Sequence, residues 1–347
     1  MDSLKILVTG ASGMVGHHAV KGLLQDGHEV TALIRHSSDD SQLKLLPGKL
    51  TIKRANFNDD SLMRTALSGM DVLIHAAGMV DPHARREEIF EVNVEGTKTL
   101  LTAADSANLR HFIHISSLSV ITGQGDLHAA NEELPLIYCG EAYADSKVDA
   151  EKAVSMFFGR SKMMLTILRP GFIYGPMERA WMPRLIENLR TRRAMLIDGG
   201  IKQTNVIYVE NLVTAIQLSI LNPKADKEVF NLTDGETVTK KELFDAICDG
   251  MGYPRITREV PGCLAKAACE TVSAIAPLLP PESRKNLSRF SRAAFRLAGV
   301  NQGFDISKAE SKLNYTQRIP FGEGMRVTLE YFKNKNSSAA KGSVSVK

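Results

Sequence analysis

The chain has 347 residues, of which 44% are hydrophobic and 24% are charged, as is ordinary for a globular protein. This length allows two domains, or one large α/β domain with an elaborated end. The 43 Lys and Arg residues against 39 Asp and Glu give a net charge of only +4, too small to indicate a nucleic-acid partner.

The start of the sequence lacks the basic stretch and apolar run of a signal peptide. No stretch of about 18 uncharged apolar residues predicts a membrane span. The four cysteines form no CxxC pair, so we expect neither a bound metal nor a thioredoxin-like redox site. Unpaired cysteines suit a reducing compartment, so we expect a cytoplasmic protein.

Short apolar runs alternate with amphipathic segments through the first half of the chain. The run "KILVTG" predicts a buried strand at 5–10, and helical spacing with a glycine stop predicts a helix at 14–27. The same patterns predict strands at 28–35, 50–57, 71–78, 111–120 and 164–170, and helices at 61–69, 89–108 and 143–158. This alternation predicts an α/β fold in which helices cover both faces of a parallel sheet.

The alternation breaks after Pro176. Helices are predicted at 182–193 and 239–252, whereas 205–221 and 228–233 read as a return to the sheet. We therefore expect one domain over 1–175, rejoined by 205–233, and a second region over 176–204 and 234–333. The polar segment 334–347 lacks a hydrophobic period and is predicted to be disordered.

A glycine loop, "TGASGMVG", lies between the first strand and the first helix. Gly10, Gly13 and Gly16 are spaced by three. A glycine turn lets the backbone approach a pyrophosphate, and the following helix offers free N–H groups and a positive dipole end. Its position in a βαβ unit favours a dinucleotide site over a plain tight turn. The loop residues expected to contact the cofactor are Gly10, Ser12, Gly13, Met14, Val15 and Gly16.

The segment "EAYADSKVDAEK" places Tyr143 four residues before Lys147 in a predicted helix. This spacing puts both side chains on one helical face. A phenol beside an ammonium is more acidic than a free phenol, which suits proton transfer. Taken alone the pair could also be coincidental, since Tyr and Lys fall four apart in many helices.

Five motifs in order resemble the extended short-chain dehydrogenase/reductase family over residues 4–333. They are "TGASGMVG", "HAAG" (75–78), "ISS" (115–117), "YADSK" (143–147) and "RPGFIYGP" (169–176). Within the NAD(P)-dependent epimerase/dehydratase superfamily, the chain most resembles the 3β-hydroxysteroid dehydrogenase and dihydroflavonol-reductase-like branch. The resemblance implies a doubly wound Rossmann domain, with 176–204 and 234–333 as a smaller, mainly helical substrate domain. Relatives often form homodimers.

The resemblance also implies catalytic roles. Tyr143 would be the acid/base, Lys147 its electrostatic partner and a ligand of the nicotinamide ribose, and Ser117 the hydroxyl that holds the substrate oxygen. Ketone reduction makes an alkoxide that needs a proton donor, and the Lys147 ammonium and the nicotinamide charge both favour phenolate. His75 is expected to pack, and Asn93 to be structural. Further cofactor contacts are implied for Asn56, Phe57, Ala76, Ala77, Gly78, Pro170, Phe172 and Ile173.

The end of the second predicted strand bears on the choice between NADP and NAD. NAD-selective sites usually have an acidic residue there, whereas this chain has Ile34 and Arg35. A guanidinium binds a 2′-phosphate that a carboxylate would repel. Arg35 therefore favours NADP, with NAD left open; a solvated surface arginine is the alternative.

Two features predict a large apolar substrate with a secondary alcohol or ketone, either steroid-like or β-keto acyl-like. Phe172 stands where sugar-nucleotide epimerases commonly carry Asn, and 263–280 is strongly apolar, although simple core packing would explain the latter equally. A sugar-nucleotide epimerase or dehydratase is the alternative enzyme. A regulatory nucleotide-binding protein is disfavoured because Ser117, Tyr143 and Lys147 are all present.

The segment 284–296 is basic and amphipathic. Helical spacing puts Lys285, Arg289, Arg292 and Arg296 on one face. Such a face could rest on an anionic membrane or bind the diphosphate of a sugar nucleotide. A solvated surface is the more ordinary reading.

Overall fold

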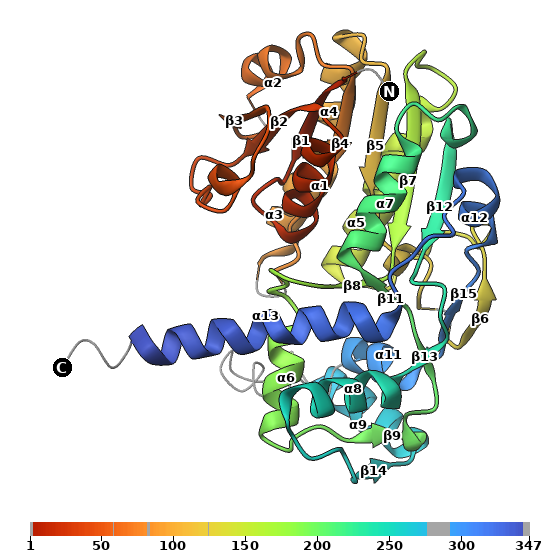
Figure 1. The fold of residues 1–347 in the computed structure, drawn as a ribbon. Coiled ribbons are helices and arrows are strands. Elements are labelled where there is room, and N and C mark those ends of the chain that lie inside the picture. Colours follow the sequence, from red (N-terminus) through yellow and green to blue (C-terminus); the bar gives the residue numbers. More distant parts are fainter. Residues whose placement is uncertain (1–2, 58, 82–83, 124, 276–291, 343–347) are drawn as a thin grey trace.

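Seven apolar runs form one parallel sheet, ordered β3-β2-β1-β4-β5-β7-β12 (Figure 1). The computed structural model describes residues 3–57, 59–81, 84–123, 125–275 and 292–342. The strands of this sheet are β1 (Lys5–Thr9), β2 (Glu29–Ile34), β3 (Leu50–Arg54), β4 (Val72–His75), β5 (His111–Ile115), β7 (Met164–Pro170) and β12 (Glu228–Leu232).

The burial of these strands explains their composition. Ile6, Leu7 and Val8 of β1 are fully buried, because helices cover both faces of the sheet. The strand order reverses between β1 and β4, and open α/β sheets bind ligands at the carboxyl edge beside such a reversal. The predicted doubly wound parallel sheet is confirmed.

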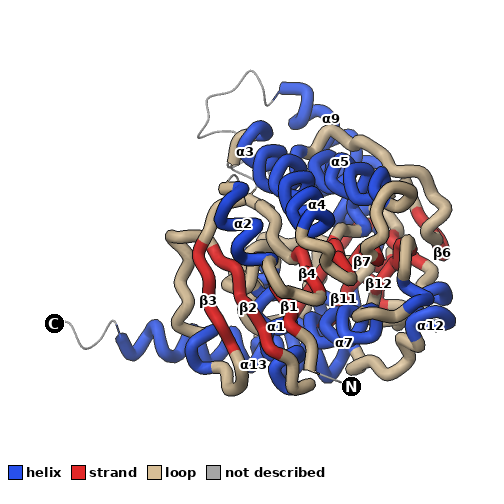
Figure 2. The backbone as a smooth tube through the Cα atoms, turned by 90° about the horizontal axis from the view of Figure 1, so that it is seen from above, coloured by secondary structure: helices blue, strands red, loops and turns tan. Residues whose placement is uncertain are grey.

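Helices lie in two layers (Figure 2). One layer contains α1 (Met14–Gln25), α7 (Val209–Ser219) and α12 (Ser307–Leu313), which share a core with one face of the sheet. The other contains α2 (Asp60–Leu67), α4 (Gly96–Ser106) and α5 (Ala142–Phe157). A short α3 (Arg86–Phe90) runs into α4 through a π-helical turn, η2 (Glu91–Glu95). The second layer therefore brings α5, with Tyr143 and Lys147, over β5.

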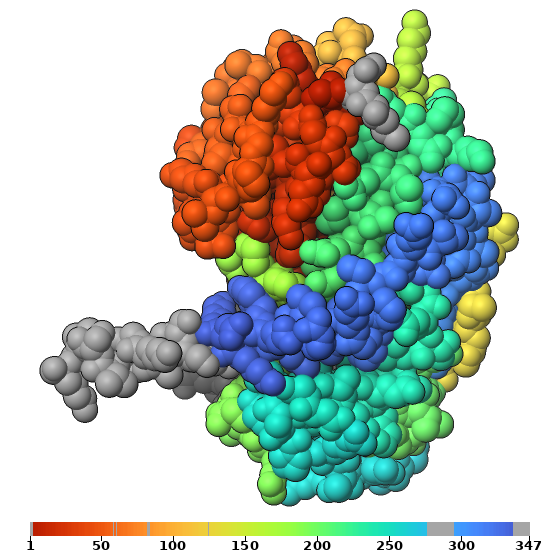
Figure 3. Space-filling view, viewed as in Figure 1, coloured from red at the N-terminus to blue at the C-terminus, as the bar shows by residue number. Residues whose placement is uncertain are grey.

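The remaining helices gather beyond the carboxyl edge of the sheet (Figure 1). They are α6 (Met182–Arg190), α8 (Lys240–Met251), α9 (Gly262–Ile275) and α11 (Arg292–Gly299). The side chain of Thr239 caps α8 and forms a capping box with Glu242. A separate apolar core joins α6 and α8 to the last helix, α13 (Phe321–Gly342). In Figure 3, α13 lies between the sheet with its two helix layers and the group of helices beyond the carboxyl edge.

Within the described residues, four short strand pairs stand outside the main sheet. They are β8 (Phe172–Tyr174) with β11 (Val206–Tyr208), β9 (Leu196–Ile197) with β14 (Glu259–Val260), β10 (Gln203–Thr204) with β13 (Val238–Thr239), and β6 (Leu127–Ala130) with β15 (Gln302–Phe304). Of the predicted return to the sheet, β12 joins the main sheet, whereas β11 pairs with β8 beyond its edge.

The end of the chain differs from its prediction. The structure continues α13 to Gly342, whereas the sequence predicts irregular chain from 334; 343–347 lie outside the described residues. Extending an existing helix costs little per residue, so no hydrophobic period is needed there. In the described part of the chain, no helix is long and apolar enough to cross a membrane.

Candidate active site

The glycine loop after β1 fits a dinucleotide. Gly10 has a φ of +67°, and a Cβ there would lie 2.7 Å from the Cα of Ala77. A Cβ on Gly16 would lie 2.3 Å from the carbonyl oxygen of Gly10. Either contact would force the backbone to move, so both positions require glycine. Gly13 caps α1, whose first N–H groups lack intrahelical partners and can bind a diphosphate.

The other predicted loop residues divide by what their side chains contact. Ser12 lines the same pocket as Arg35. Val15 packs against the core of the sheet, and Met14 packs against the core of the C-terminal helices. The predicted cofactor contacts of Met14 and Val15 would therefore be made by their backbone.

The segment after β4 connects the glycine loop to Lys147. Ala76 and Ala77 lie against Gly10, and a Cβ on Gly78 would lie 3.4 Å from Nζ of Lys147. His75 hydrogen bonds to Thr9 Oγ1 (2.8 Å) and to Thr97 Oγ1 (2.9 Å). Burial, and secondarily Lys147, lower the pKa of His75 to about 3. His75 is thus a neutral packing residue, as predicted.

The predicted acid/base residues meet at the carboxyl end of β5. Nζ of Lys147 donates to the carbonyl oxygen of Ile115 (2.8 Å), and a side-chain hydrogen bond joins Tyr143 to Ser117. Oγ of Ser117 also accepts from the backbone N–H of Ser119 (3.1 Å). Burial lowers the pKa of Lys147 to about 8.

The pKa of Tyr143 corrects one expectation. Burial raises it above its ordinary value, and only the hydrogen bond from Ser117 opposes that shift. The sequence predicts the reverse direction from the neighbouring Lys147, because sequence spacing does not reveal how strongly a phenol is desolvated. Tyr143 is therefore a phenol near neutral pH, the form that donates a proton.

Asn93 has the predicted structural role. Its Oδ1 accepts from the backbone N–H of Met79 (2.7 Å), and its Nδ2 donates to Met79 O (3.1 Å) and to Oγ of Ser146 (2.9 Å). It lies in the π-helical turn η2, a distortion often found near functional sites. These bonds fix the segment after Gly78 against α5.

Arg35 lies in a pocket of about 220 Å³ at the end of β2. The pocket is lined by Ser12, His17, Arg35, Ser37, Ser38, Asp39, Gln42, Leu43, Met177 and Arg179. Arg179 is a residue that the sequence analysis missed: it follows "RPGFIYGP" by three positions, but it lies 144 residues from Arg35 in the chain. Asp39 accepts from the backbone N–H of Ser41 (2.9 Å), so its carboxylate is held at the same pocket.

Asn56 and Phe57 do not line this pocket. Asn56 is exposed, and the ring of Phe57 packs edge-on to His75 at 5.7 Å between ring centres. A Cβ on Gly96 would lie 2.7 Å from the Phe57 ring, so this glycine admits the ring. Their predicted cofactor contacts remain predictions.

Beyond the end of the sheet, Pro170 ends β7 and Phe172 and Ile173 lie in β8. The Phe172 ring packs against Trp181 (6.1 Å between ring centres), whose Nε1 donates to the carbonyl oxygen of Ile173 (2.9 Å). The apolar segment 263–280 forms α9 up to Ile275, and the side chain of Leu264 on it is 62% exposed. Residues 276–280 lie outside the described chain.

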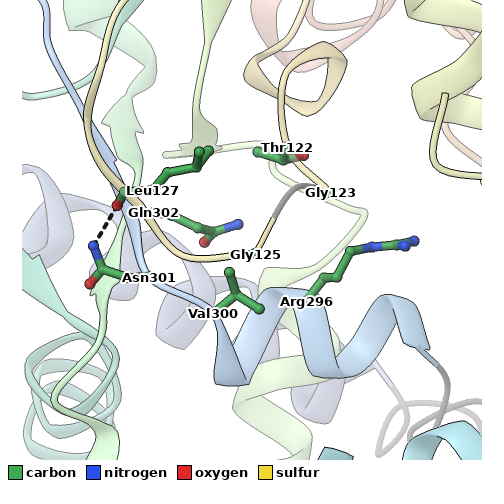
Figure 4. Close-up of a pocket in the computed structure, with 8 residues that line it drawn as sticks. All are labelled: Thr122, Gly123, Gly125, Leu127, Arg296, Val300, Asn301 and Gln302. Atoms are coloured by element: carbon green, nitrogen blue, oxygen red, sulfur yellow. Dashed lines mark hydrogen bonds between the residues drawn. The ribbon is translucent and has the colours of Figure 1, made fainter. Parts of the chain in front are cut away.

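The basic face predicted at 284–296 is described only in part. Residues 284–291 lie outside the described chain, and Arg292 begins α11. Arg296 pairs with Glu141, two residues before Tyr143, so its guanidinium is neutralised by a carboxylate. Figure 4 shows Arg296 beside a pocket of about 10 Å³, room for about one water and far too small for a cofactor.

Known proteins resemble this chain over most of its length. A 3-beta-hydroxysteroid dehydrogenase of Mycolicibacterium neoaurum is 28% identical over 354 residues, covering 95% of this chain and 92% of the relative. The 4-hydroxy-2-methyl-3-oxo-4-farnesyl-3,4-dihydroquinoline-1-oxide ketoreductase of Stigmatella aurantiaca is 27% identical over 325 residues, covering 93% and 95%.

Solved structures share the fold. The dTDP-glucose 4,6-dehydratase DesIV of Streptomyces venezuelae, solved with NAD bound, matches with a TM-score of 0.76 at 21% identity, over 96% of this chain and 98% of that one. The model of the 3-beta hydroxysteroid dehydrogenase/isomerase family matches residues 7–253. This match covers most of the chain, which therefore belongs to the 3-beta hydroxysteroid dehydrogenase/isomerase family.

Proposed function

We propose that this protein reduces a ketone, or oxidises the matching secondary alcohol, on a large apolar substrate, with NADP(H) as the hydride carrier. The observation that carries the proposal is the meeting of Ser117, Tyr143 and Lys147 beside the Gly10 loop and Gly78. A dinucleotide at the glycine loop and a substrate oxygen at Tyr143 would then share one edge of the sheet.

The chain's own residues supply the proton chemistry. Bound nicotinamide would supply or accept the hydride. Ser117 would hold the substrate oxygen, and Tyr143, a phenol near neutral pH, would donate its proton to the oxygen as negative charge develops there. The ammonium of Lys147 would stabilise the phenolate form of Tyr143 that remains after the proton is transferred. The reverse sequence serves alcohol oxidation.

The preference for NADP rests on the pocket at β2. Arg35 and Arg179 line it together with Ser37 and Ser38. Such a set suits a phosphate monoester. Asp39 lines the same pocket and opposes an anion, so the preference depends on the arginines outweighing it.

The apolar substrate is supported from two sides. The named substrates of the relatives, a steroid and a farnesylated quinoline oxide, are both large and apolar. Phe172, which packs on Trp181, occupies the position at which epimerases would bind a nucleotide phosphate. A phenyl ring offers a phosphate no hydrogen bond, and burying a diphosphate without polar partners is costly in free energy. The epimerase alternative would need partners from the basic segment, of which Arg296 already pairs with Glu141.

A substrate panel tests the proposal. The protein is mixed with NADPH and, separately, with 3-keto steroids, 3-oxoacyl compounds and UDP-sugars, and the absorbance of reduced nicotinamide is followed. Net loss with an apolar ketone is expected. Calorimetry in the presence of NADP should show no tight UDP-sugar binding; tight binding with no net NADPH loss would favour the epimerase instead. The same assays with NADH would measure the cofactor preference.

A further inference from the structure

The helical face that carries the acid/base pair continues for one more turn of α5, to Glu151. Tyr143, Lys147 and Glu151 are spaced by four and therefore share one helical face. They contact three consecutive residues at the end of β5. Tyr143 bonds Ser117, Lys147 bonds the carbonyl oxygen of Ile115, and Oε2 of Glu151 accepts from Oγ of Ser116 (2.6 Å).

Glu151 is a buried carboxylate held by several donors. Only 1% of Glu151 and 4% of Arg169 are exposed. Nε of Arg169, on the neighbouring β7, lies 3.0 Å from Oε1 and 3.1 Å from Oε2 of Glu151, and Nη2 also donates to Oε1. Together with the hydroxyl of Ser116, these donors fix the carboxylate in one orientation.

Stability alone does not explain this pair. Removing two charges from water costs several kcal/mol, and well-packed apolar residues in place of a buried ion pair are often as stable or more stable. The same pair joins the helix of Tyr143 and Lys147 to the strand end that carries Ser117. The Glu151–Arg169 pair is therefore placed where it can hold Tyr143, Lys147 and Ser117 in position relative to one another.

We propose that Glu151 is a positioning residue for proton transfer: through Ser116 it fixes the strand end that carries Ser117, and from the next turn of α5 its carboxylate stabilises the ammonium of Lys147. The inference rests on the proposed function, since it concerns the proton that Tyr143 and Lys147 manage. Arg169 has the supporting role of holding the Glu151 carboxylate in place.

The surroundings of Lys147 explain why a carboxylate is needed. Burial lowers the pKa of Lys147, and the charge of Glu151 opposes that shift. The titratable groups facing Lys147 from β4 and β5 are His75 and His114, whose pKa values burial lowers, so both are neutral. Tyr143 on α5 is a neutral phenol, and η2 contributes the uncharged Asn93. The guanidinium of Arg169 on β7 is bound to Glu151.

This role predicts a pH dependence. Ketone reduction needs both protons of the Tyr143–Lys147 pair, one to donate and one to stabilise the resulting phenolate. Reduction should therefore decline as the pH rises through the pKa of Lys147, about 8. Without the negative charge of Glu151 the pair loses its proton more readily, so the decline should begin at lower pH.

The test compares Glu151→Gln with Asp145→Asn. Asp145 is a matched control: it lies on the same helix, is 3% exposed, and pairs with Arg86 (3.0 Å) on the side of α3. The pH profile of 3-keto steroid reduction is measured for each, with NADPH affinity. Glu151→Gln should move the alkaline decline down by about one pH unit with unchanged NADPH affinity. Asp145→Asn should leave the decline in place.

Two further measurements keep the inference falsifiable. Because Glu151→Gln leaves Arg169 buried without a counter-ion and could unfold the chain, Glu151→Leu/Arg169→Met replaces the whole pair with apolar residues. In addition, nitrogen NMR of lysine-labelled protein, with Lys147→Met to assign the signal, follows the Lys147 titration without any substrate. The pH profile of the double variant and the NMR titration of the Glu151 variants should each show a lower apparent pKa for Lys147 than in the unmodified protein.

An unchanged pH profile and Lys147 titration in a folded variant would overturn the inference. Its failure differs from failure of the proposed function. If Tyr143→Phe is inactive while the Glu151 variants keep the original profile, only the role of Glu151 is wrong. If Tyr143→Phe stays active, the acid/base assignment itself is wrong.

Discussion

The two ends of the predicted cofactor site are built in opposite ways. At the acid/base end, Lys147 bonds Ile115 of β5 and Ser116 bonds Glu151 of α5, so two of the three polar groups are held by regular elements, and Ser117 bonds the adjacent Ser119. At the adenosine end, Arg35 and Arg179 lie in loops that line an open pocket. Chemistry demands fixed geometry, whereas phosphate recognition tolerates mobile charge. The loop-built end is therefore where cofactor preference can change without loss of the reaction.

The largest expected effect breaks the acid/base end. Tyr143→Phe removes the hydroxyl that is proposed to donate the proton, and should lower turnover by about 10²-fold or more. Cofactor affinity should hardly change, and steady-state kinetics with NADPH titration measures both. Tyr138→Phe is the matched control, since Tyr138 is exposed and bonds Asp149 outside the site. Near-normal turnover in Tyr143→Phe would contradict the proton transfer proposed here.

The next effect tests the adenosine end. Arg35→Asp should weaken NADPH binding by about 2–4 kcal/mol, through loss of a charged hydrogen bond and gain of repulsion, while NADH binding is spared or improved. Arg179→Ala should weaken NADPH binding less, since it adds no repulsion. Binding is measured by fluorescence titration. Arg160→Asp, an exposed site beyond α5, is the control. Equal losses for both cofactors would mean that Arg35 supports the fold.

A smaller effect concerns how the stability of the fold depends on pH, through His75 at the end of β4 and His111 at the start of β5. Burial lowers the pKa values of His75 and His111 from 6.5 to about 3, so in this interval the unfolded chain binds protons that the folded chain does not. Stability should therefore fall as the pH drops below 6.5, by about 2 kcal/mol for each histidine at pH 5. Denaturant unfolding at both pH values measures this. His111→Gln should reduce the dependence, and an unchanged slope would show that His111 is not held neutral.

The sequence predicts local features well and distant partnerships poorly. The apolar runs of β1, β4 and β5 and the spacing of Tyr143 and Lys147 are local patterns that physical rules interpret directly. Arg179 could not be assigned, because nothing in its own neighbourhood indicates the distant loop of Arg35. The pairing of Glu151 with Arg169 was likewise missed, since a carboxylate at helical spacing reads equally well as a solvated residue.

The same limit applies to β6 and β15. Each is a few residues long, and neither alternates clearly between polar and apolar side chains. Their pairing depends on Asn301, whose Nδ2 donates to Leu127 O (2.6 Å) and whose Oδ1 accepts from the backbone N–H of Gln203 (2.8 Å). A single buried amide thus joins three segments that no local pattern relates.

That amide has a consequence for how the protein is made. The loop before Tyr143 is bonded, through Asp126 and Leu127, to Asn301, a residue that leaves the ribosome about 175 positions later. Contacts of such long sequence separation form late and slow the folding of a chain. The sheet can therefore assemble during synthesis before the segment around Asn301 fixes the loop that precedes Tyr143.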